Sequence, residues 1–330
     1  MTLSFFPTSK KIGNIIMKDH VIRYLELKQT EPPIIQKCGE RYLPEGIIRD
    51  GRIIDIETLS MIVEECMGDW GLKGKRLVRF TIPDNFVVVR KISIPTEVES
   101  DEIEGYIYLE IGSSIHLPFE DPVFDYVELP SETTEKEILL FAAPKDIVLD
   151  YVEFFKEMKL NPVAADISPL CLYRSFFYLN HVNPQDHHLL LQFDLTMINA
   201  AIIYQHRPVF IREVEMDIPF SKWEEEINSQ GEKNFKWPTE EPPISFDFIL
   251  KELERVMSYY RFSMNQGKAG VTKILLNGDY PLLEEIEKTL TEQFDLPVIT
   301  IQSQQNSRLA YPTFHARFAP VLGLALKEVK

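Results

Sequence analysis

The stretch His188–Ile203, HLLLQFDLTMINAAII, contains two apolar segments separated by a short polar turn. Apolar runs of this length, bounded by turn residues, predict two buried β-strands joined tightly. A third apolar segment, Val209–Val214, follows a turn at 205–208, so the stretch opens a three-strand meander. Asp194 ends the first strand and Thr196 follows it, so the turn between the two strands carries a carboxylate and a hydroxyl.

A similar pattern occurs near the N-terminus. Asn14–Leu27 predicts strand, turn and strand, with Lys18 and Asp19 at the bend, and a third strand follows Pro32 and Pro33. Two meanders in one chain predict a duplicated architecture.

The first half also contains an additional unit, at 77–163. Extended segments at Leu77–Pro83 and Asn85–Pro95 precede a capping-box signature at Thr96 and Glu99, which predicts a helix start. Two more apolar segments and an amphipathic helix through Ile147–Met158 follow. This order predicts a compact α+β insert.

Helix boundaries and a loop are predicted elsewhere by capping and turn residues. Asp55 is the expected N-cap of a helix that Gly68 and Gly71 end. Ser168 starts another helix with proline at its first turn. Asn228–Pro243, rich in Glu and Pro, is the expected loop before a long helix through Ile249–Tyr260. A last short helix is expected at 319–326.

Composition excludes several classes of function. The 330 residues carry 51 acidic and 35 basic side chains, a net charge of −16, which repels nucleic acid and anionic lipid. No apolar run approaches the roughly 20 residues that span a bilayer, so no direct membrane insertion is expected. The N-terminus is expected to be a flexible tail through residue 13 and not a secretory signal. Three widely spaced cysteines indicate reduced thiols, as in a cytoplasm.

Two motifs point to a family. Leu43–Asp55, LPEGIIRDGRIID, and Ile82–Pro95, IPDNFVVVRKISIP, resemble motifs of the type IV pilus assembly protein PilM family, relatives of the cell-division protein FtsA. Glu110 followed by Leu117-Pro118-Phe119, the segment Asn161–Asp166, and the final Gly323–Lys327 also fit that family.

The resemblance implies a fold and a domain plan. The fold class is α/β: a duplicated actin/Hsp70-like (ribonuclease H-like) two-domain fold, with an inserted α+β 1C-type subdomain in the first half. After the tail at 1–13, the implied subdomains are 1A at 14–76 and 164–185, 1C at 77–163, 2A at 186–215 and 273–330, and a reduced 2B-like part at 216–272.

The resemblance also implies a partner. The family grips the cytoplasmic tail of a PilN-like single-pass inner-membrane protein in a groove between the first subdomain and the insert. Docking an extended peptide in a preformed groove is a known recognition mode. The candidate groove residues are Phe86, Val88, Arg90, Pro118 and Phe119, for which ordinary sheet packing is the alternative interpretation.

The nucleotide motifs of the family are altered here. A glycine turn allows backbone N–H groups to approach phosphates. The first such turn, which begins Asp-Ile-Gly in the family, is Ile16-Met17-Lys18, and the second is Asp194-Leu195-Thr196. Of the paired glycines of the adenosine motif, only Gly278 is left. Lys18, Asp194, Thr196 and Gly278 are therefore the candidate relics of a nucleotide site, and for Asp194 a simple turn-capping role is the alternative.

No catalytic or metal site is expected. Ser113, Ser114 and His116 lie close in sequence, but no nucleophile elbow is present. His187 and His188 are adjacent, and neighbouring strand residues point to opposite faces.

The resulting expectation is a cytoplasmic scaffold without enzymatic activity. It would serve a type IV pilus or related competence or secretion system, at the inner face of the membrane through its PilN-like partner and with other machine components as further partners. No cofactor is expected. Two alternatives stay open: a working ATPase that uses Asp194, Thr196 and Gly278 with ATP and magnesium, and an FtsA-like cell-division or cytoskeletal filament.

Overall fold

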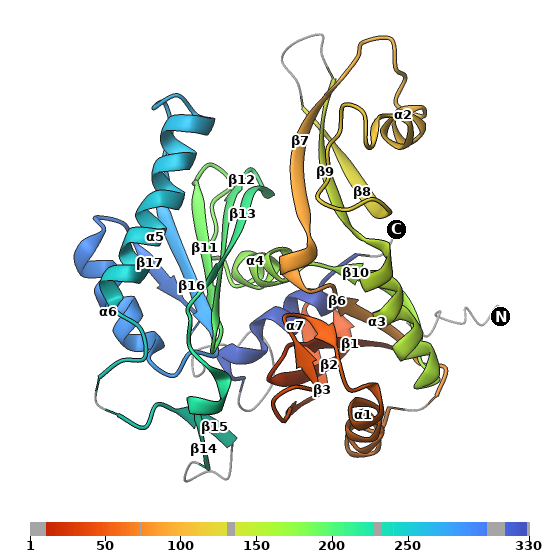
Figure 1. The fold of residues 1–330 in the computed structure, drawn as a ribbon, viewed down its shortest axis with the longest axis vertical. Coiled ribbons are helices and arrows are strands. Elements are labelled where there is room, and N and C mark those ends of the chain that lie inside the picture. The colour runs from red at the N-terminus through yellow and green to blue at the C-terminus, as the bar shows by residue number, and fades with distance from the viewer. Residues whose placement is uncertain are drawn as a thin grey trace, which may run out of the picture. The chain divides into compact units, whose positions relative to one another are not determined.

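The first meander forms part of a five-stranded sheet in the computed structural model, which describes residues 11–72, 74–130, 136–227, 233–239, 241–301 and 314–328. The strand order is β10-β6-β1-β2-β3, with β1, β2 and β3 antiparallel and β6 and β10 added in parallel (Figure 1). Strand β1 begins at Ile12, so residues 12 and 13 belong to a strand and not to the expected tail, and residues 1–10 of that expected tail lie outside the described ranges. The strands are β1 (Ile12–Met17), β2 (Val21–Thr30), β3 (Pro33–Tyr42), β6 (Leu77–Thr81) and β10 (Asn161–Asp166).

The second meander forms part of a second five-stranded sheet with the same topology. Its order is β13-β12-β11-β16-β17, again three antiparallel strands followed by two parallel ones. Two sheets with one topology confirm the predicted duplication. The strands are β11 (His188–Phe193), β12 (Met197–Tyr204), β13 (Arg207–Glu215), β16 (Lys273–Gly278) and β17 (Val298–Thr300).

Helices α5 (Phe246–Ser258) and α6 (Leu283–Gln293) pack against one face of the second sheet (Figure 1). Alternate residues of β11, Leu189, Leu191 and Phe193, are fully buried in this core. A π-helix, η3 (Tyr259–Met264), continues α5 beyond its last turn.

Helix α1 (Ile56–Trp70) confirms the predicted caps. The Asp55 carboxylate accepts a hydrogen bond from the N–H of Thr58 at 3.0 Å, and Gly71 ends the helix with a left-handed φ of 62°. Helix α4 (Ser168–Tyr178) begins at the predicted serine, and the C-terminal helix is α7 (Ala319–Ala325). A small hairpin, β4 (Ile48–Arg49) and β5 (Arg52–Ile53), and a 3-10 turn, η5 (Ala316–Phe318), complete these elements.

The insert contains a three-stranded antiparallel sheet of order β7-β9-β8. Helix α2 (Ile103–Glu110) buries Ile103 and Ile107 against Ile138 and Leu140 of this sheet. The strands β6 and β10 pair within the first sheet, so the sheet of the insert begins after the expected boundary at residue 77. Its elements are η1 (Asp84–Phe86), β7 (Val88–Ile94), β8 (Pro122–Leu129), β9 (Lys136–Pro144) and the following α3 (Lys145–Glu157).

Two local predictions were wrong. The segment expected as a loop, Asn228–Pro243, contains β15 (Lys233–Lys236), which pairs with β14 (Glu224–Ile227) after the short 3-10 helix η2 (Phe220–Lys222). Ion pairs between the two strands favour this pairing: Lys233 contacts Glu225 diagonally at 2.9 Å, and Lys236 contacts Glu224, the residue opposite it, at 3.8 Å. A polar composition gives no sign of such a hairpin. The helix expected from Thr96 begins only at Ile103.

The chain divides into two compact units, 1–81, 150–175 and 302–330 in one, and 82–149 and 176–301 in the other. The insert therefore shares its unit with the second sheet, and the four subdomain boundaries themselves stay predictions. None of the helices in the described ranges has the length and apolar character needed to cross a membrane.

Candidate functional site

The turn between β1 and β2 holds Lys18 and Asp19. The N–H of Lys18 donates to the carbonyl of Val21 at 2.9 Å and closes the turn. The Asp19 carboxylate accepts the N–H groups of Asp50 at 2.7 Å and Gly51 at 3.0 Å. This aspartate therefore anchors the β4–β5 hairpin to the turn.

Burial raises the pKa of Asp19, and the hydrogen bonds from the Gly51 and Asp50 backbone oppose that rise. The hydroxyl of Tyr151 donates to the carbonyl of Gly51 at 2.8 Å, so the same hairpin is held from a second side. The turn is thus a structural junction of the first unit, with a half-buried acid at its tip.

The turn between β11 and β12 holds Asp194 and Thr196. The N–H of Asp194 donates to the carbonyl of Met197 at 2.8 Å, and the side-chain amide of Gln192 donates to the Asp194 carboxylate at 3.2 Å. The indole N–H of Trp223 donates to the carbonyl of Leu195 at 3.1 Å, and the N–H of Met216 to that of Thr196 at 2.9 Å. The turn is fastened on both sides by neighbouring segments.

Gly278 lies next to this turn, at the end of β16, where the register pairs it with Phe193. Its φ is +151°, and a Cβ atom built on it would stand 2.0 Å from the carbonyl oxygen of Phe193. That oxygen accepts the N–H groups of Asp279 at 2.7 Å and Tyr280 at 3.1 Å. The glycine is therefore required by the close approach of two backbone segments, whatever else it does.

The structure brings three of the four candidate nucleotide residues together. Asp194, Thr196 and Gly278 lie at the carboxyl ends of two neighbouring parallel strands of the second unit, β11 and β16. Lys18 belongs to the first unit. No cluster of three or more His, Cys, Asp or Glu side chains suited to a metal ion occurs within the described ranges.

The candidate partner residues lie on the insert. Val88 and Arg90 lie opposite Ala142 and Leu140, so their side chains share the sheet face on which α2 packs. The Arg90 guanidinium donates to the carbonyl of His116, in the loop that leads to Pro118 and Phe119. Pro118 is exposed and Phe119 half-buried, and Phe86 lies in η1, directly before β7.

Sequence reasoning missed two residues that shape these turns. Trp223 covers the second turn from 27 residues beyond Thr196 in the chain, and it packs edge-on against Tyr280 with ring centroids 5.6 Å apart. Gly51, between the strands of the β4–β5 hairpin, donates its N–H to the Asp19 carboxylate, a contact that the sequence pattern does not indicate. Both are long-range contacts that local patterns do not encode.

Comparisons with known proteins place the chain in a family. The family model described as type IV pilus assembly protein PilM matches residues 16–228. A solved structure, the PilM-PilN type IV pilus biogenesis complex, is similar with a TM-score of 0.70 and 18% identity, over 97% of this chain and 98% of that one. This likeness shows that the chain has the actin-like fold that the family resemblance implied. No curated protein matches the chain by sequence.

Other solved structures are more distant. MreB5 of Spiroplasma citri bound to AMPPNP has a TM-score of 0.47 at 10% identity, with 96% of this chain and 95% of that one covered. The cytoplasmic domain of EpsL, an inner-membrane component of the type II secretion system of Vibrio cholerae, has a TM-score of 0.47 at 9% identity, with 82% and 83% covered. Neither likeness carries an argument. The family model, which spans more than half of the residues, shows that this chain belongs to the type IV pilus assembly protein PilM family.

Proposed function

We propose that this protein is a cytoplasmic scaffold, without enzymatic activity, of a type IV pilus or a related competence or secretion machine. It is held at the inner face of the cell membrane by binding the cytoplasmic tail of a PilN-like single-pass protein. The membership of the chain in the PilM family carries this proposal, and its likeness to a structure solved as a PilM-PilN complex supports the partner.

The turn geometry supports the proposed lack of ATP binding. In the first turn a half-buried carboxylate, Asp19, stands where the fold would bring phosphate, and it is engaged by two backbone N–H groups. The close approach of the Phe193 carbonyl explains why residue 278 is a glycine, so the presence of this glycine is no evidence that the protein binds adenosine. The Asp194 carboxylate accepts a hydrogen bond from the side-chain amide of Gln192, so it is already engaged by a neighbouring residue of the protein.

The insert offers a surface suited to an extended peptide. Val88 and Arg90 continue the apolar sheet face beyond the part that α2 covers, and Arg90 ties this face to the 116–119 loop. A half-buried apolar floor beside an exposed cation and an exposed proline suits a tail that carries an acid and an apolar anchor. The contribution of the first subdomain to the groove stays a prediction of the family resemblance.

Tail binding tests the proposal directly. A fluorescent peptide of the PilN-like tail should bind the intact chain, and Arg90→Ala should weaken binding about tenfold, the cost of one charge-assisted contact. Lys91→Ala is the matched control, because Lys91 points to the opposite sheet face, where it pairs with Glu137 at 2.7 Å. Equal losses in both variants would place the tail elsewhere, and no binding at high micromolar tail would sink the scaffold proposal.

Calorimetric titration with magnesium-ATP separates the scaffold from the working ATPase. The scaffold proposal expects no binding in the micromolar range. Micromolar binding that Asp194→Asn abolishes would instead establish the ATPase alternative, with Asp194 as its acidic residue. Polymerisation on lipid vesicles without any partner would favour the FtsA-like alternative.

A further inference from the structure

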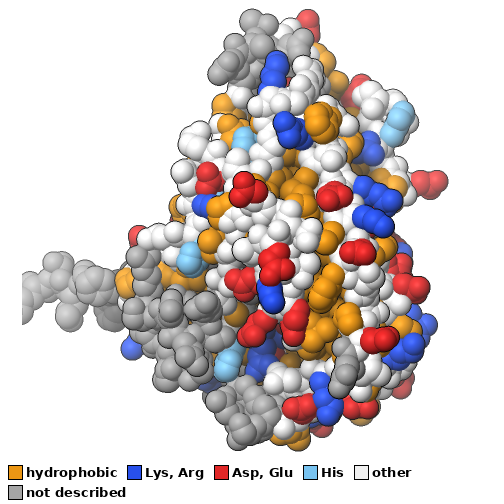
Figure 2. All heavy atoms as spheres, turned by 90° about the vertical axis from the view of Figure 1, so that its left-hand side faces the viewer, with side chains coloured by type: hydrophobic (Ala, Val, Ile, Leu, Met, Phe, Trp, Pro, Cys, Tyr) orange, Lys and Arg blue, Asp and Glu red, His pale blue; other side chains and the backbone are white. Residues whose placement is uncertain are grey.

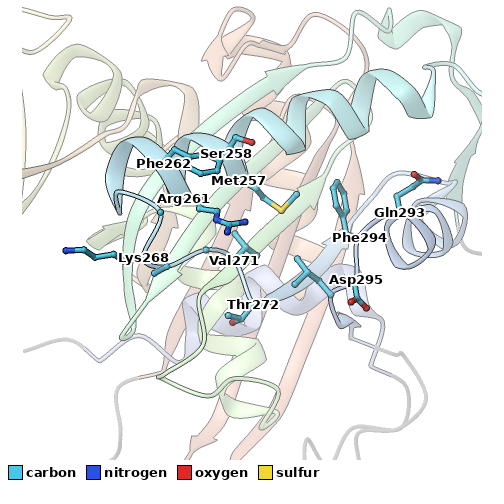
Figure 3. A pocket seen from close by; sticks show the side chains of 14 residues that line it. Met257, Ser258, Arg261, Phe262, Lys268, Val271, Thr272, Gln293, Phe294 and Asp295 are labelled. Atoms are coloured by element: carbon cyan, nitrogen blue, oxygen red, sulfur yellow. The ribbon is translucent and has the colours of Figure 1, made fainter.

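The second unit has a hollow of about 570 Å³ that the proposed function does not use. It lies between the end of α5 with the π-helix η3, the loop at 267–272, and the segment 293–296 after α6 (Figure 3). Its volume falls within the range of small-ligand and peptide sites, about 300–1,000 Å³. All of its walls belong to one compact unit, and none belongs to the insert.

The walls of the hollow are largely apolar. Met257, Val271, Phe294 and Leu296 line it and are half-buried, so part of each side chain remains accessible. Phe262 stands at its edge with 62% of its surface exposed. On the side of the molecule where α5 and α6 lie, exposed hydrophobic side chains form a band among charged ones (Figure 2). Contiguous exposed apolar surface of this kind marks interaction sites.

Arg261 is the positively charged group inside the hollow. Its guanidinium points toward Met257 and Val271, whereas the Lys268 side chain extends outward from the rim (Figure 3). The Arg261 stem packs on Gly270, where an added Cβ would lie 3.6 Å from its Cδ, and its guanidinium lies 5.3 Å from the centre of the Phe262 ring. The side chain is therefore oriented before any ligand arrives.

A turn after the π-helix fixes the backbone at Arg261. The carbonyl of Arg261 accepts the N–H of Gly267 at 2.7 Å, across a turn in which Gln266 and Gly267 have positive φ. Arg261 lies within the π-helix, a rare element that is found frequently at functional sites. Within the described ranges, Arg261 forms no ion pair, although the protein carries a net charge of −16.

We propose that this hollow is a second docking site, for an extended segment of a partner protein that carries one carboxylate beside an apolar side chain. Arg261 binds the carboxylate with its planar pair of N–H donors, and Phe294 and Val271 contact the apolar side chain. Asp295 stands on the opposite wall (Figure 3), where it repels a second acid and disfavours a polyphosphate. The site is separate from the tail-binding surface, so either proposal can fail without the other.

The probe for this site is the acetylated tetrapeptide amide of sequence Leu-Asp-Leu-Phe, titrated into the isotope-labelled full chain and followed by amide NMR. We expect shifts confined to residues that line the hollow, with a Kd of about 1 mM. The matched peptide with Asn in place of Asp should bind about tenfold more weakly. Arg261→Gln should remove that difference between the two peptides.

Arg255→Gln is the control variant, since Arg255 lies on α5 outside the hollow. Arg255 forms an ion pair with Glu252, and in the variant Glu252 keeps its other ion pair, with Arg212 at 3.0 Å. The proposal is overturned by an absence of shifts at about 10 mM peptide, or by equal binding of the Asp and Asn peptides. Tighter binding of inorganic phosphate than of the peptide would also overturn it. Concentration-dependent sedimentation that Arg261→Gln abolishes would assign the hollow to a second copy of this chain instead.

Discussion

Replacing Gly278 by alanine should destabilise the second unit, because the added methyl group has no room. It would stand 2.0 Å from the carbonyl oxygen of Phe193, at a backbone φ of +151°. A backbone region reserved for glycine costs other residues about 1–3 kcal/mol, and overpacking adds about 1–3 kcal/mol. The free energy of unfolding should therefore fall by about 2–6 kcal/mol, with the binding of any ligand playing no part.

Urea denaturation of the purified chain measures this change, with Gly105→Ala as the control. Gly105 lies within α2, and apart from its chain neighbours and the backbone of its own helix no atom stands within 4 Å of its added Cβ. Since glycine is less favourable than alanine in a helix by about 0.5–1 kcal/mol, the control should be slightly stabilised. If Gly278→Ala changes the free energy of unfolding by less than about 0.5 kcal/mol, the contact with Phe193 does not explain the glycine. Its retention would then again argue for a nucleotide.

Three further outcomes are expected. Asp166→Asn should lower the free energy of unfolding by about 3–5 kcal/mol, because its buried carboxylate pairs with Arg174 at 2.7 Å. Arg174 also donates to the carbonyl of Gly323 in α7 at 3.2 Å, so hydrogen exchange in that helix should become faster, and unchanged exchange would contradict this. Burial lowers the pKa of His188 from 6.5 to about 4, so the unfolded chain takes up a proton first as the pH falls. Stability should therefore drop by up to about 3 kcal/mol between pH 6.5 and 4, a slope that calorimetric unfolding of His188→Gln should lack. Asp19→Asn should lower the free energy of unfolding, measured by urea denaturation, by about 1–3 kcal/mol. The amide has one acceptor oxygen, whereas the two carboxylate oxygens accept the N–H groups of Asp50 and Gly51. An unchanged free energy of unfolding would show that Asp19 does not anchor the hairpin.

The fold was predicted where the signal is local and repeated. The two meanders were visible because their apolar runs alternate with turn residues, and the caps of α1 were visible because Asp55 and Gly71 act within one helical turn. The hairpin β14–β15 was missed because its strands are polar, and their pairing depends on cross-strand charges such as Lys233 and Glu225.

The candidate site was predicted less completely, for a physical reason. The sequence identifies which glycines a phosphate site has lost, but the reason why Gly278 persists lies in the oxygen of Phe193, 85 residues earlier in the chain. The hollow around Arg261 had no sequence signal, since its walls come from a π-helix, a loop and the end of α6.

The indole of Trp223 that fastens the second turn also makes that turn optically visible. Trp223 and Trp237 pack together with ring centroids 5.2 Å apart in the second unit, whereas Trp70, the third tryptophan, stacks on Tyr24 in the first. In a Trp70→Phe variant, all indole fluorescence would come from the neighbourhood of Leu195. Emission from the intact chain and from this variant can thus follow ligand binding and unfolding in each unit separately, without an added label.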